Sequence, residues 1–207
     1  DSNSLIISVP SIYRMLIKIL SDKSKFLFNK NNFITCGEPL DKSLALNIFC
    51  LSPNTFFNLY GSTEVSPWII FLDVIKFIKS KKVFNSPLLP AGKPLPNVLL
   101  KISKSKELLV SADSVFSGYL NLDNNSVFSE VALNTFFRTG DNFELIDGFF
   151  YCKGRINNSL KIGGVFINPM ILEAKIKDDL NFEYLLVIPD PIKLKIFILF
   201  FTNKNQF

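Results

Sequence analysis

Hydrophobic residues recur every three or four positions in the first element that the sequence predicts. Between Ser11 and Leu20 the following residues share one face of a helix: Ile12, Met15, Leu16, Ile19 and Leu20. A second helix is predicted from Asp41 to Phe49, with Asp41 near its start. Short apolar runs predict buried strands at Phe33–Cys36 and Thr55–Leu59, and Tyr60-Gly61-Ser62 is expected to end the second strand. These strands and helices point to an α/β fold.

The pattern changes after a loop at Pro87–Pro96 that is rich in proline and glycine. Strand-like runs separated by polar turns follow: Val98–Ile102, Glu107–Val110, Phe143–Ile146 and Phe149–Tyr151. Asp147-Gly148, between the last two runs, is typical of a β-hairpin. Asn168-Pro169 then leads into a predicted helix at Met170–Lys177, and two β-rich runs close the chain: Tyr184–Ile188 and Leu194–Phe201. These last elements predict a small α+β unit that begins near residue 157.

The composition predicts a folded protein that has no membrane span and does not bind nucleic acid. Hydrophobic residues make up 48% of the 207 residues and aromatic residues 14%, enough for a packed core. The longest apolar runs, such as Ile196–Phe201, reach only about a third of a bilayer-spanning helix. The net charge is +5, but the lysines are dispersed, with one tight cluster at Lys79, Lys81 and Lys82, and only three residues are arginine. Nucleic-acid recognition favours arginine on a concentrated face.

The chain contains no histidine and three unevenly spaced cysteines, Cys36, Cys50 and Cys152. The lack of histidine excludes Ser-His-Asp and Cys-His catalysis and histidine-based zinc sites. Sparse cysteines without a Cys-x-x-Cys pair suit a reducing compartment, and no signal peptide is visible, so we expect a cytoplasmic location. The sequence begins without Met, which suggests that residues are missing upstream.

The segment Asn58-Leu59-Tyr60-Gly61-Ser62-Thr63-Glu64 concentrates the most chemistry. A strand delivers an aromatic ring, a Gly-Ser turn, a hydroxyl and a carboxylate to one place. Such a turn can present backbone N–H groups and the Thr63 hydroxyl to a phosphate, while Glu64 can hold a divalent cation. The alternative is an ordinary turn after a strand with a capping threonine, and the segment alone does not decide between the two.

Two further clusters follow in the second half of the chain. In Arg138-Thr139-Gly140-Asp141 the carboxylate can accept hydrogen bonds from both hydroxyls of a ribose, or it can simply satisfy its own turn. The stretch Gly154–Gly164 contains Asn157-Asn158 and Gly163-Gly164, residues that tolerate changes in φ and ψ and therefore suit a hinge. A plain linker between domains is the alternative for this stretch.

Together and in this order, the three clusters resemble the motifs of the adenylate-forming superfamily, which includes acyl-CoA synthetases, peptide-synthetase adenylation domains and luciferases. The family patterns are Asn-x-Tyr-Gly-x-Thr-Glu, Arg-Thr-Gly-Asp and Gly-Arg-x-Asp-x-x-x-Lys-x-x-Gly. Supporting matches lie around them: Gly37-Glu38-Pro39-Leu40, Ala91–Pro96, Glu107-Leu108 through Gly118-Tyr119, and Glu173. The resemblance covers nearly the whole chain.

The resemblance implies an ATP site and residue roles within it. Tyr60 would stack on adenine, Asp141 would hold the ribose hydroxyls, and Arg155 would assist from the hinge side. Thr63 would contact the α-phosphate and Glu64 would bind Mg²⁺. The remaining implied positions are Gly37, Glu38, Gly61 and Ser62 for the nucleotide, Lys161 among the catalytic residues, and Asn157 at the hinge. A carboxylate would attack the α-phosphorus of ATP, giving an acyl-adenylate and pyrophosphate, before transfer to a phosphopantetheine thiol on a carrier protein or CoA.

The sequence also departs from the family patterns. Asn157 replaces the hinge aspartate, and Lys106 and Ala112 replace two glycines. The family's phosphate loop, rich in Ser, Thr and Gly, would lie before residue 1, and its catalytic lysine would lie beyond residue 207. We therefore expect these residues to be an incomplete piece that is inactive alone.

The implied substrate is a small carboxylate, and amino-acid-activating members of the superfamily match best. Positions that line the substrate pocket in those members would make a mostly apolar pocket here: Ile34, Cys36, Leu59, Pro67 and Trp68. The expected fold is α/β: residues 1–155 are the later part of the large domain and include a β-barrel-like unit, and residues 156–207 are the start of a small mobile α+β domain. Two alternatives stay open, a fatty or aryl acyl-CoA or acyl-carrier-protein ligase and a non-catalytic remnant.

Overall fold

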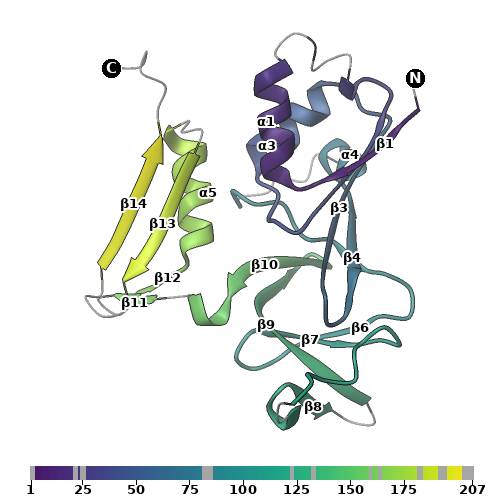
Figure 1. Cartoon of the computed structure of the whole chain (residues 1–207), viewed down its shortest axis with the longest axis vertical. Coiled ribbons are helices and arrows are strands. Elements are labelled where there is room, and N and C mark those ends of the chain that lie inside the picture. The colour runs from purple at the N-terminus through teal and green to yellow at the C-terminus, as the bar shows by residue number, and fades with distance from the viewer. Residues whose placement is uncertain are drawn as a thin grey trace.

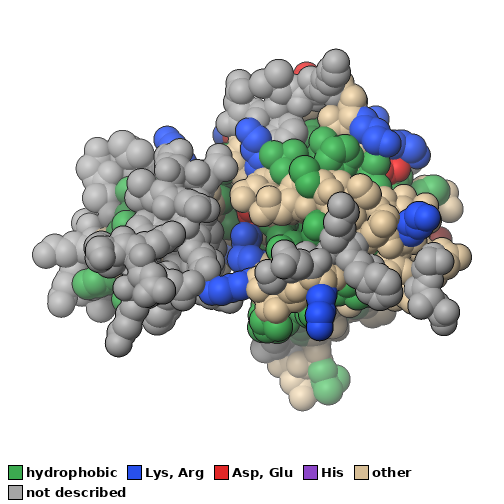
Figure 2. All heavy atoms as spheres, turned by 90° about the horizontal axis from the view of Figure 1, so that it is seen from above, with side chains coloured by type: hydrophobic (Ala, Val, Ile, Leu, Met, Phe, Trp, Pro, Cys, Tyr) green, Lys and Arg blue, Asp and Glu red, His purple; other side chains and the backbone are tan. Residues whose placement is uncertain are grey.

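The computed structural model of this chain describes residues 3–20, 23, 27–80, 86–121, 124–131, 134–158, 160–162, 165–180, 184–190 and 195–201. Figure 1 shows a first sheet with helices at the top, a second sheet below it, and a smaller C-terminal group to the left. Among the described residues, no helix is long and apolar enough to cross a membrane. On the face shown in Figure 2, the lysine and arginine side chains lie in several separate spots.

The first sheet has five strands in the order of the chain: β1 (Leu5–Ser8), β2 (Asn32–Cys36), β3 (Thr55–Ser62), β4 (Ser66–Asp73) and β5 (Lys93–Pro94). The pairs β1–β2 and β2–β3 are parallel, whereas β3–β4 and β4–β5 are antiparallel. β3 runs to Ser62, three residues beyond the predicted end at Leu59, because Tyr60 and Ser62 still pair with β4. The residues expected to break the strand are therefore its last three.

Three helices pack with this sheet in one apolar core: α1 (Pro10–Leu20), α3 (Lys42–Cys50) and α4 (Val74–Lys79). The core includes Tyr13 from α1, Leu44 from α3 and Phe56 from β3, each at most 1% exposed. The Asp41 side chain accepts a hydrogen bond from the backbone N–H of Leu44 and so caps α3. This confirms the predicted helix and its start.

The second sheet contains β6 (Leu99–Ile102), β7 (Glu107–Ser111), β8 (Phe128–Val131), β9 (Asn134–Ile146) and β10 (Phe149–Arg155), with the 3₁₀ helix η2 (Asn124–Ser126) before β8. Its order is β10-β9-β7-β6, and β8 also pairs with β9. Within the described residues no pairing joins β6 to β10, so the unit expected to be barrel-like is an open antiparallel sheet.

The two sheets are joined at Gly92, which precedes β5 and forms a bridge with Phe150 of β10. The N–H of Phe150 donates to the carbonyl of Gly92 at 2.8 Å. Gly92 has a φ of +130°, and a Cβ there would lie 1.9 Å from the carbonyl oxygen of Phe71. Only glycine fits this position, so the close approach of this segment to β4 depends on it.

The C-terminal group contains η3 (Ile156–Asn158), β11 (Leu160–Ile162), β12 (Val165–Ile167), α5 (Pro169–Leu180), β13 (Tyr184–Asp190) and β14 (Lys195–Phe201). β11–β12 and β13–β14 form two antiparallel pairs. The carboxylate of Glu173 on α5 accepts a hydrogen bond from the N–H of Val187 on β13 at 2.7 Å. The helix and the two strands expected in this region are confirmed; that the group is a separate, mobile domain stays a prediction.

Candidate functional site

Tyr60 and Asp141 meet although 81 residues separate them. The Tyr60 hydroxyl, at the end of β3, donates a hydrogen bond to Oδ2 of Asp141 on β9 at 2.6 Å. Arg155 lies at the end of β10 opposite Asp141 in the strand register, and its Nε is 3.0 Å from Asp141 Oδ1. One carboxylate thus joins the first two sequence clusters and the start of the third.

The strand segment that carries Asp141 is held by Glu107, a carboxylate on β7 that is 4% exposed. Glu107 Oε2 accepts hydrogen bonds from Arg138 at 3.0 and 2.8 Å, and Oε1 accepts one from the N–H of Gly140 at 3.0 Å. The Thr139 hydroxyl donates to a backbone carbonyl of β7 and accepts the N–H of Asp141. A buried carboxylate with these partners is well satisfied, so Glu107 fixes the backbone around Asp141.

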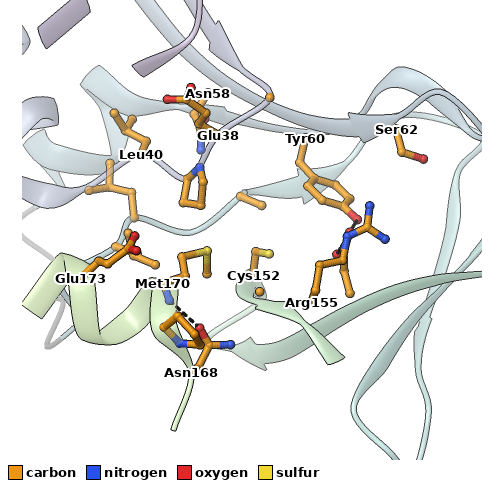
Figure 3. Close-up of a pocket in the computed structure, with 18 of the residues that line it drawn as sticks. Glu38, Leu40, Asn58, Tyr60, Ser62, Cys152, Arg155, Asn168, Met170 and Glu173 are labelled. Carbon is orange, nitrogen blue, oxygen red and sulfur yellow. Dashed lines mark hydrogen bonds and ion pairs between the residues drawn. The ribbon is translucent and has the colours of Figure 1, made fainter. Parts of the chain in front are cut away.

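A cavity of about 610 Å³ opens beside this group, between the first sheet, β10 and the C-terminal elements. In Figure 3, Tyr60 projects from β3 toward Arg155. Glu38, Leu40 and Asn58 lie across the cavity from α5, and Cys152 lies between these two groups. The lining residues are Gly37 to Leu40, Asn58 to Ser62, Leu88, Leu89, Ala91, Asp141, Cys152, Gly154, Arg155, Asn168 to Met170, Glu173, Leu186 and Val187. Its wall therefore combines apolar side chains with a few polar groups, as small-molecule sites do.

Burial sets the protonation of the groups in this cavity. It is the main cause that raises the pKa of Tyr60 well above its usual value, and the nearby Asp141 carboxylate raises it further. Burial also raises the pKa of Asp141, although the Tyr60 hydroxyl and Arg155 act in the opposite direction. The pKa of the Cys152 thiol is raised to about 12, first by burial. Cys152 therefore stays protonated near neutral pH and is a poor nucleophile.

Glu64 and Thr63 lie in the turn between β3 and β4, next to a second cavity of about 280 Å³ that Glu64 lines together with Arg155 and Tyr119. The pKa of Glu64 is lowered, first by the Ser62 hydroxyl and also by Tyr119 and Arg155. The Ser62 hydroxyl is buried beside this carboxylate, and it makes no hydrogen bond of standard geometry with the described residues. Thr63 is exposed and lines neither cavity.

Apart from Thr63, the expected nucleotide residues therefore fall into two neighbouring groups that share Arg155. Those that line the larger cavity are Gly37, Glu38, Tyr60, Gly61, Ser62, Asp141 and Arg155. Glu64 lines the smaller one, together with Asn157, the expected hinge residue, which is exposed in η3. Lys161 lies in β11, and its side chain is outside the described part of the structure.

The residues expected to bind the carboxylate substrate do not lie together at one cavity. Of the five, Leu59 alone lines the larger cavity. Ile34 and Cys36 are half-buried in β2, whereas Pro67 and Trp68 are exposed on β4. These four line neither cavity, so their role in substrate binding stays a prediction.

Several lining residues carried no signal in the sequence. Cys152, Met170 and Leu186 come from three different elements, and only the folded chain brings them to one cavity. Tyr119 had a signal, because the pair Gly118-Tyr119 is part of the resemblance, but nothing in the sequence connected it to Glu64. Its hydroxyl donates to Glu64 Oε1 at 2.9 Å.

Comparison with known proteins identifies the family to which this chain belongs. The model of the AMP-binding enzyme family matches residues 3–120, more than half of the 207 residues. The chain belongs to the AMP-binding enzyme family. Its similar curated proteins include the D-alanine–D-alanyl carrier protein ligases of Staphylococcus aureus strains RF122 and MRSA252, each 26% identical over 187 residues. That match covers 88% of this chain but 38% of each relative, so the chain spans well under half of their length.

Solved structures confirm the fold of this AMP-binding chain. Klebsiella oxytoca NpsA in complex with 3-hydroxyanthranilyl-AMSN is similar with a TM-score of 0.80 at 18% identity, over 98% of this chain and 43% of that one. The Vibrio cholerae adenylation domain AlmE, in complex with glycyl-adenosine-5'-phosphate, gives 0.62 at 20% identity, over 90% and 38%. The expected α/β architecture of adenylate-forming enzymes is therefore confirmed, with an open sheet in place of a barrel.

The residues of the site suit a nucleotide that brings its own Mg²⁺. Among the described residues, no group of three or more His, Cys, Asp or Glu side chains is arranged to hold a metal. Mg²⁺ is usually held by one or two carboxylates together with substrate phosphates and waters. Glu64, a single carboxylate with a lowered pKa beside Arg155, fits that arrangement.

Proposed function

We propose that the protein carrying this chain activates a carboxylate with ATP and passes the acyl group to a thiol. A carboxylate oxygen attacks the α-phosphorus of ATP, the bond from that phosphorus to the bridging oxygen breaks, and pyrophosphate leaves. The thiol then attacks the acyl carbon, and AMP leaves. Such a reaction depends on positioning and charge stabilisation, which a site without histidine can provide.

The observation that carries this proposal is the meeting of Tyr60, Asp141 and Arg155 at one large cavity. The hydrogen bond between Tyr60 and Asp141 at 2.6 Å and the ion pair between Arg155 and Asp141 at 3.0 Å link three sequence segments. Arg155 and Asp141 face each other because β9 pairs with β10, whereas Tyr60 reaches them from the first sheet. A nucleotide needs its base, ribose and phosphate contacts within the span of one ligand. The family membership agrees with this role.

In this proposal each residue has one task toward the nucleotide. The Tyr60 ring stacks on the adenine, and Asp141 accepts hydrogen bonds from the ribose hydroxyls. Arg155 supplies positive charge next to the ribose and phosphates. Thr63 donates to the α-phosphate, and Mg²⁺ bound by Glu64 would neutralise charge on the phosphates. We assign Lys161 to the same reaction by resemblance.

We propose an amino acid as the substrate and a carrier-protein thiol as the acceptor. The support is the likeness to ligases named for D-alanine and D-alanyl carrier protein. An aryl acid is the second candidate, because the similar NpsA structure contains a 3-hydroxyanthranilyl compound. CoA is the alternative acceptor of the acyl group. The alternative to an enzyme is a non-catalytic remnant of one.

The test is carboxylate-dependent exchange between ATP and pyrophosphate in the natural protein that contains this chain. D-alanine, glycine and 3-hydroxyanthranilate form the first panel, and acceptor thiols are then compared for the substrate that reacts. We expect exchange above a control without carboxylate for an amino acid. Exchange only with aryl acids would overturn the amino-acid assignment, and no exchange with any carboxylate would favour the remnant.

A further inference from the structure

Tyr119 contacts the candidate metal ligand from a loop that follows β7. Its hydroxyl donates to Glu64 Oε1 at 2.9 Å, across 55 residues of sequence. The Tyr119 ring packs edge-on against Phe116, with ring centroids 4.8 Å apart. The ring therefore holds the hydroxyl in place, and the hydrogen bond is made to one defined oxygen of Glu64.

The same loop also binds the backbone around Glu64. The N–H of Phe116 donates to the Glu64 carbonyl at 2.8 Å, and the Ser114 hydroxyl donates to the Val65 carbonyl at 2.6 Å. The main chain of Glu64 and its side chain are thus fixed by one loop. Tyr119 is the member of that loop that reaches the carboxylate.

Asn124 in turn fixes the backbone of Tyr119. Its side chain accepts the N–H of Tyr119 at 2.8 Å and donates to the carbonyl of the same residue at 3.1 Å. Gly118, with a φ of +136°, lies so close that a Cβ there would come within 2.6 Å of the Asn124 amide nitrogen. A glycine before the tyrosine is therefore required for this arrangement.

We propose that Tyr119 is a positioning residue that holds Oε1 of Glu64 and so orients the carboxylate for Mg²⁺. The inference rests on the proposed function. A glutamate side chain has several rotatable bonds, and ordering it before the metal arrives reduces the entropy lost on binding. Tyr119 and Glu64 both line the smaller cavity, so the hydrogen bond lies at its wall.

The test compares Tyr119→Phe with Tyr151→Phe in the natural protein. The first change removes the hydroxyl and keeps the ring against Phe116; the second removes a hydroxyl from β10, and Tyr151 lines neither cavity. Mn²⁺ affinity is measured by electron paramagnetic resonance with α,β-methylene-ATP, which does not turn over. The Mg²⁺ concentration for half-maximal pyrophosphate exchange is measured in parallel.

We expect Tyr119→Phe to weaken Mn²⁺ binding and to raise the required Mg²⁺ by about 10-fold, as the loss of a hydrogen bond to a charged group predicts. The KM for the carboxylate and the melting temperature should stay unchanged, and excess Mg²⁺ should restore exchange. Tyr151→Phe should behave as wild type.

Three results would count against the proposal or its basis. Wild-type Mn²⁺ affinity in Tyr119→Phe would overturn the positioning role, and so would an equal loss in Tyr151→Phe. Wild-type protein without carboxylate-dependent exchange would overturn the proposed function alone, because the Mn²⁺ titration still decides whether Tyr119 positions a metal-binding carboxylate.

Discussion

Asp141 is a buried carboxylate whose pKa is raised by its surroundings. It is 8% exposed, and burial raises its pKa above the ordinary value of 3.8 despite the contacts with Tyr60 and Arg155. The folded protein therefore binds a proton at Asp141 more tightly than the unfolded chain does. It follows that the stability contributed by this group falls as the pH rises from 3.8 through the raised pKa.

Replacing Asp141 by Asn should separate nucleotide binding from stability. The Asn side chain keeps the shape but has only one uncharged oxygen that can accept a hydrogen bond from the ribose hydroxyls. We therefore expect ATP affinity to fall by at least about 10-fold. The melting temperature should fall by less than about 4 °C near pH 7, because the buried charge is removed with its desolvation cost. Calorimetry and thermal melts from pH 4 to 7 measure both.

The pH series provides the control for this prediction. Relative to wild type, Asp141→Asn should become more stable as the pH rises across that interval, because only wild type ionises at position 141. A stability difference that is independent of pH would show that Asp141 ionises as easily in the folded chain as in the unfolded one.

At the level of single residues, the structure gathers the residues expected at the nucleotide at one cavity and scatters most of those expected at the carboxylate. Tyr60, Asp141 and Arg155 each lie in a short motif of fixed spacing, which can be read directly from the sequence. Trp68 and Pro67 were placed by resemblance alone, and both are exposed on β4. Residues that meet through tertiary packing leave no local pattern, which is why the contact between Tyr119 and its carboxylate partner could not be predicted.

At the level of elements, local patterns predicted α1, α3, α5 and several strands, but they missed β1, β4, α4 and β8 and misplaced the end of β3. The helix at Lys42–Cys50 was predictable because Asp41 caps it through its own side chain. The end of β3 was not, because pairing of Ser62 with Ser66 extends the strand through a glycine. Such extension depends on a partner strand, and the open form of the second sheet likewise depends on pairings distant in sequence.

Asn168 joins α5 to β10 across the expected hinge. Its side-chain oxygen accepts the N–H groups of Met170 and Ile171 and so caps α5, while its amide nitrogen donates to the carbonyl of Lys153. Asn168 and Met170 both line the larger cavity. This one side chain therefore attaches the helix to the wall of the candidate site.

Asn168→Asp should keep the cap and lose the attachment. The carboxylate still accepts from α5 but cannot donate to Lys153, so we expect faster hydrogen exchange at the start of α5 and a loss of about 1–2 kcal/mol in stability. Hydrogen-exchange mass spectrometry measures the first effect and denaturant unfolding the second. Asn97→Asp, in an exposed turn, is the matched control. Unchanged exchange in α5 would show that other contacts hold the helix.

Asn157 tests whether η3 is a hinge. In the superfamily that the chain resembles, the C-terminal domain rotates between adenylate formation and thioester formation, and the residue here takes up the backbone change. Asn tolerates unusual φ and ψ angles, whereas proline fixes φ near −65°. Asn157→Pro should therefore preserve one half-reaction and impair the other by about 10-fold or more. Pyrophosphate exchange and thioester formation are measured side by side, and equal loss of both would place the hinge elsewhere.

At the scale of the whole molecule, the match covers only 38% of the length of the D-alanine–D-alanyl carrier protein ligases. The described residues hold the groups assigned to base, ribose and metal, on two sheets that meet at Gly92 and Phe150.

The 207 residues alone should therefore bind nucleotide weakly and show no adenylation. Tyr60, Asp141 and Arg155 are all present, so we expect AMP to bind with a dissociation constant on the order of 1 mM, whereas well under half of an enzyme of this family should not supply the full transition-state stabilisation. Isothermal titration calorimetry measures AMP binding, and circular dichroism establishes that the chain is folded. Pyrophosphate exchange above a no-enzyme control would contradict the prediction and show that the two sheets suffice. Loss of AMP binding in Asp141→Asn links any binding to the site that Asp141 and Tyr60 share.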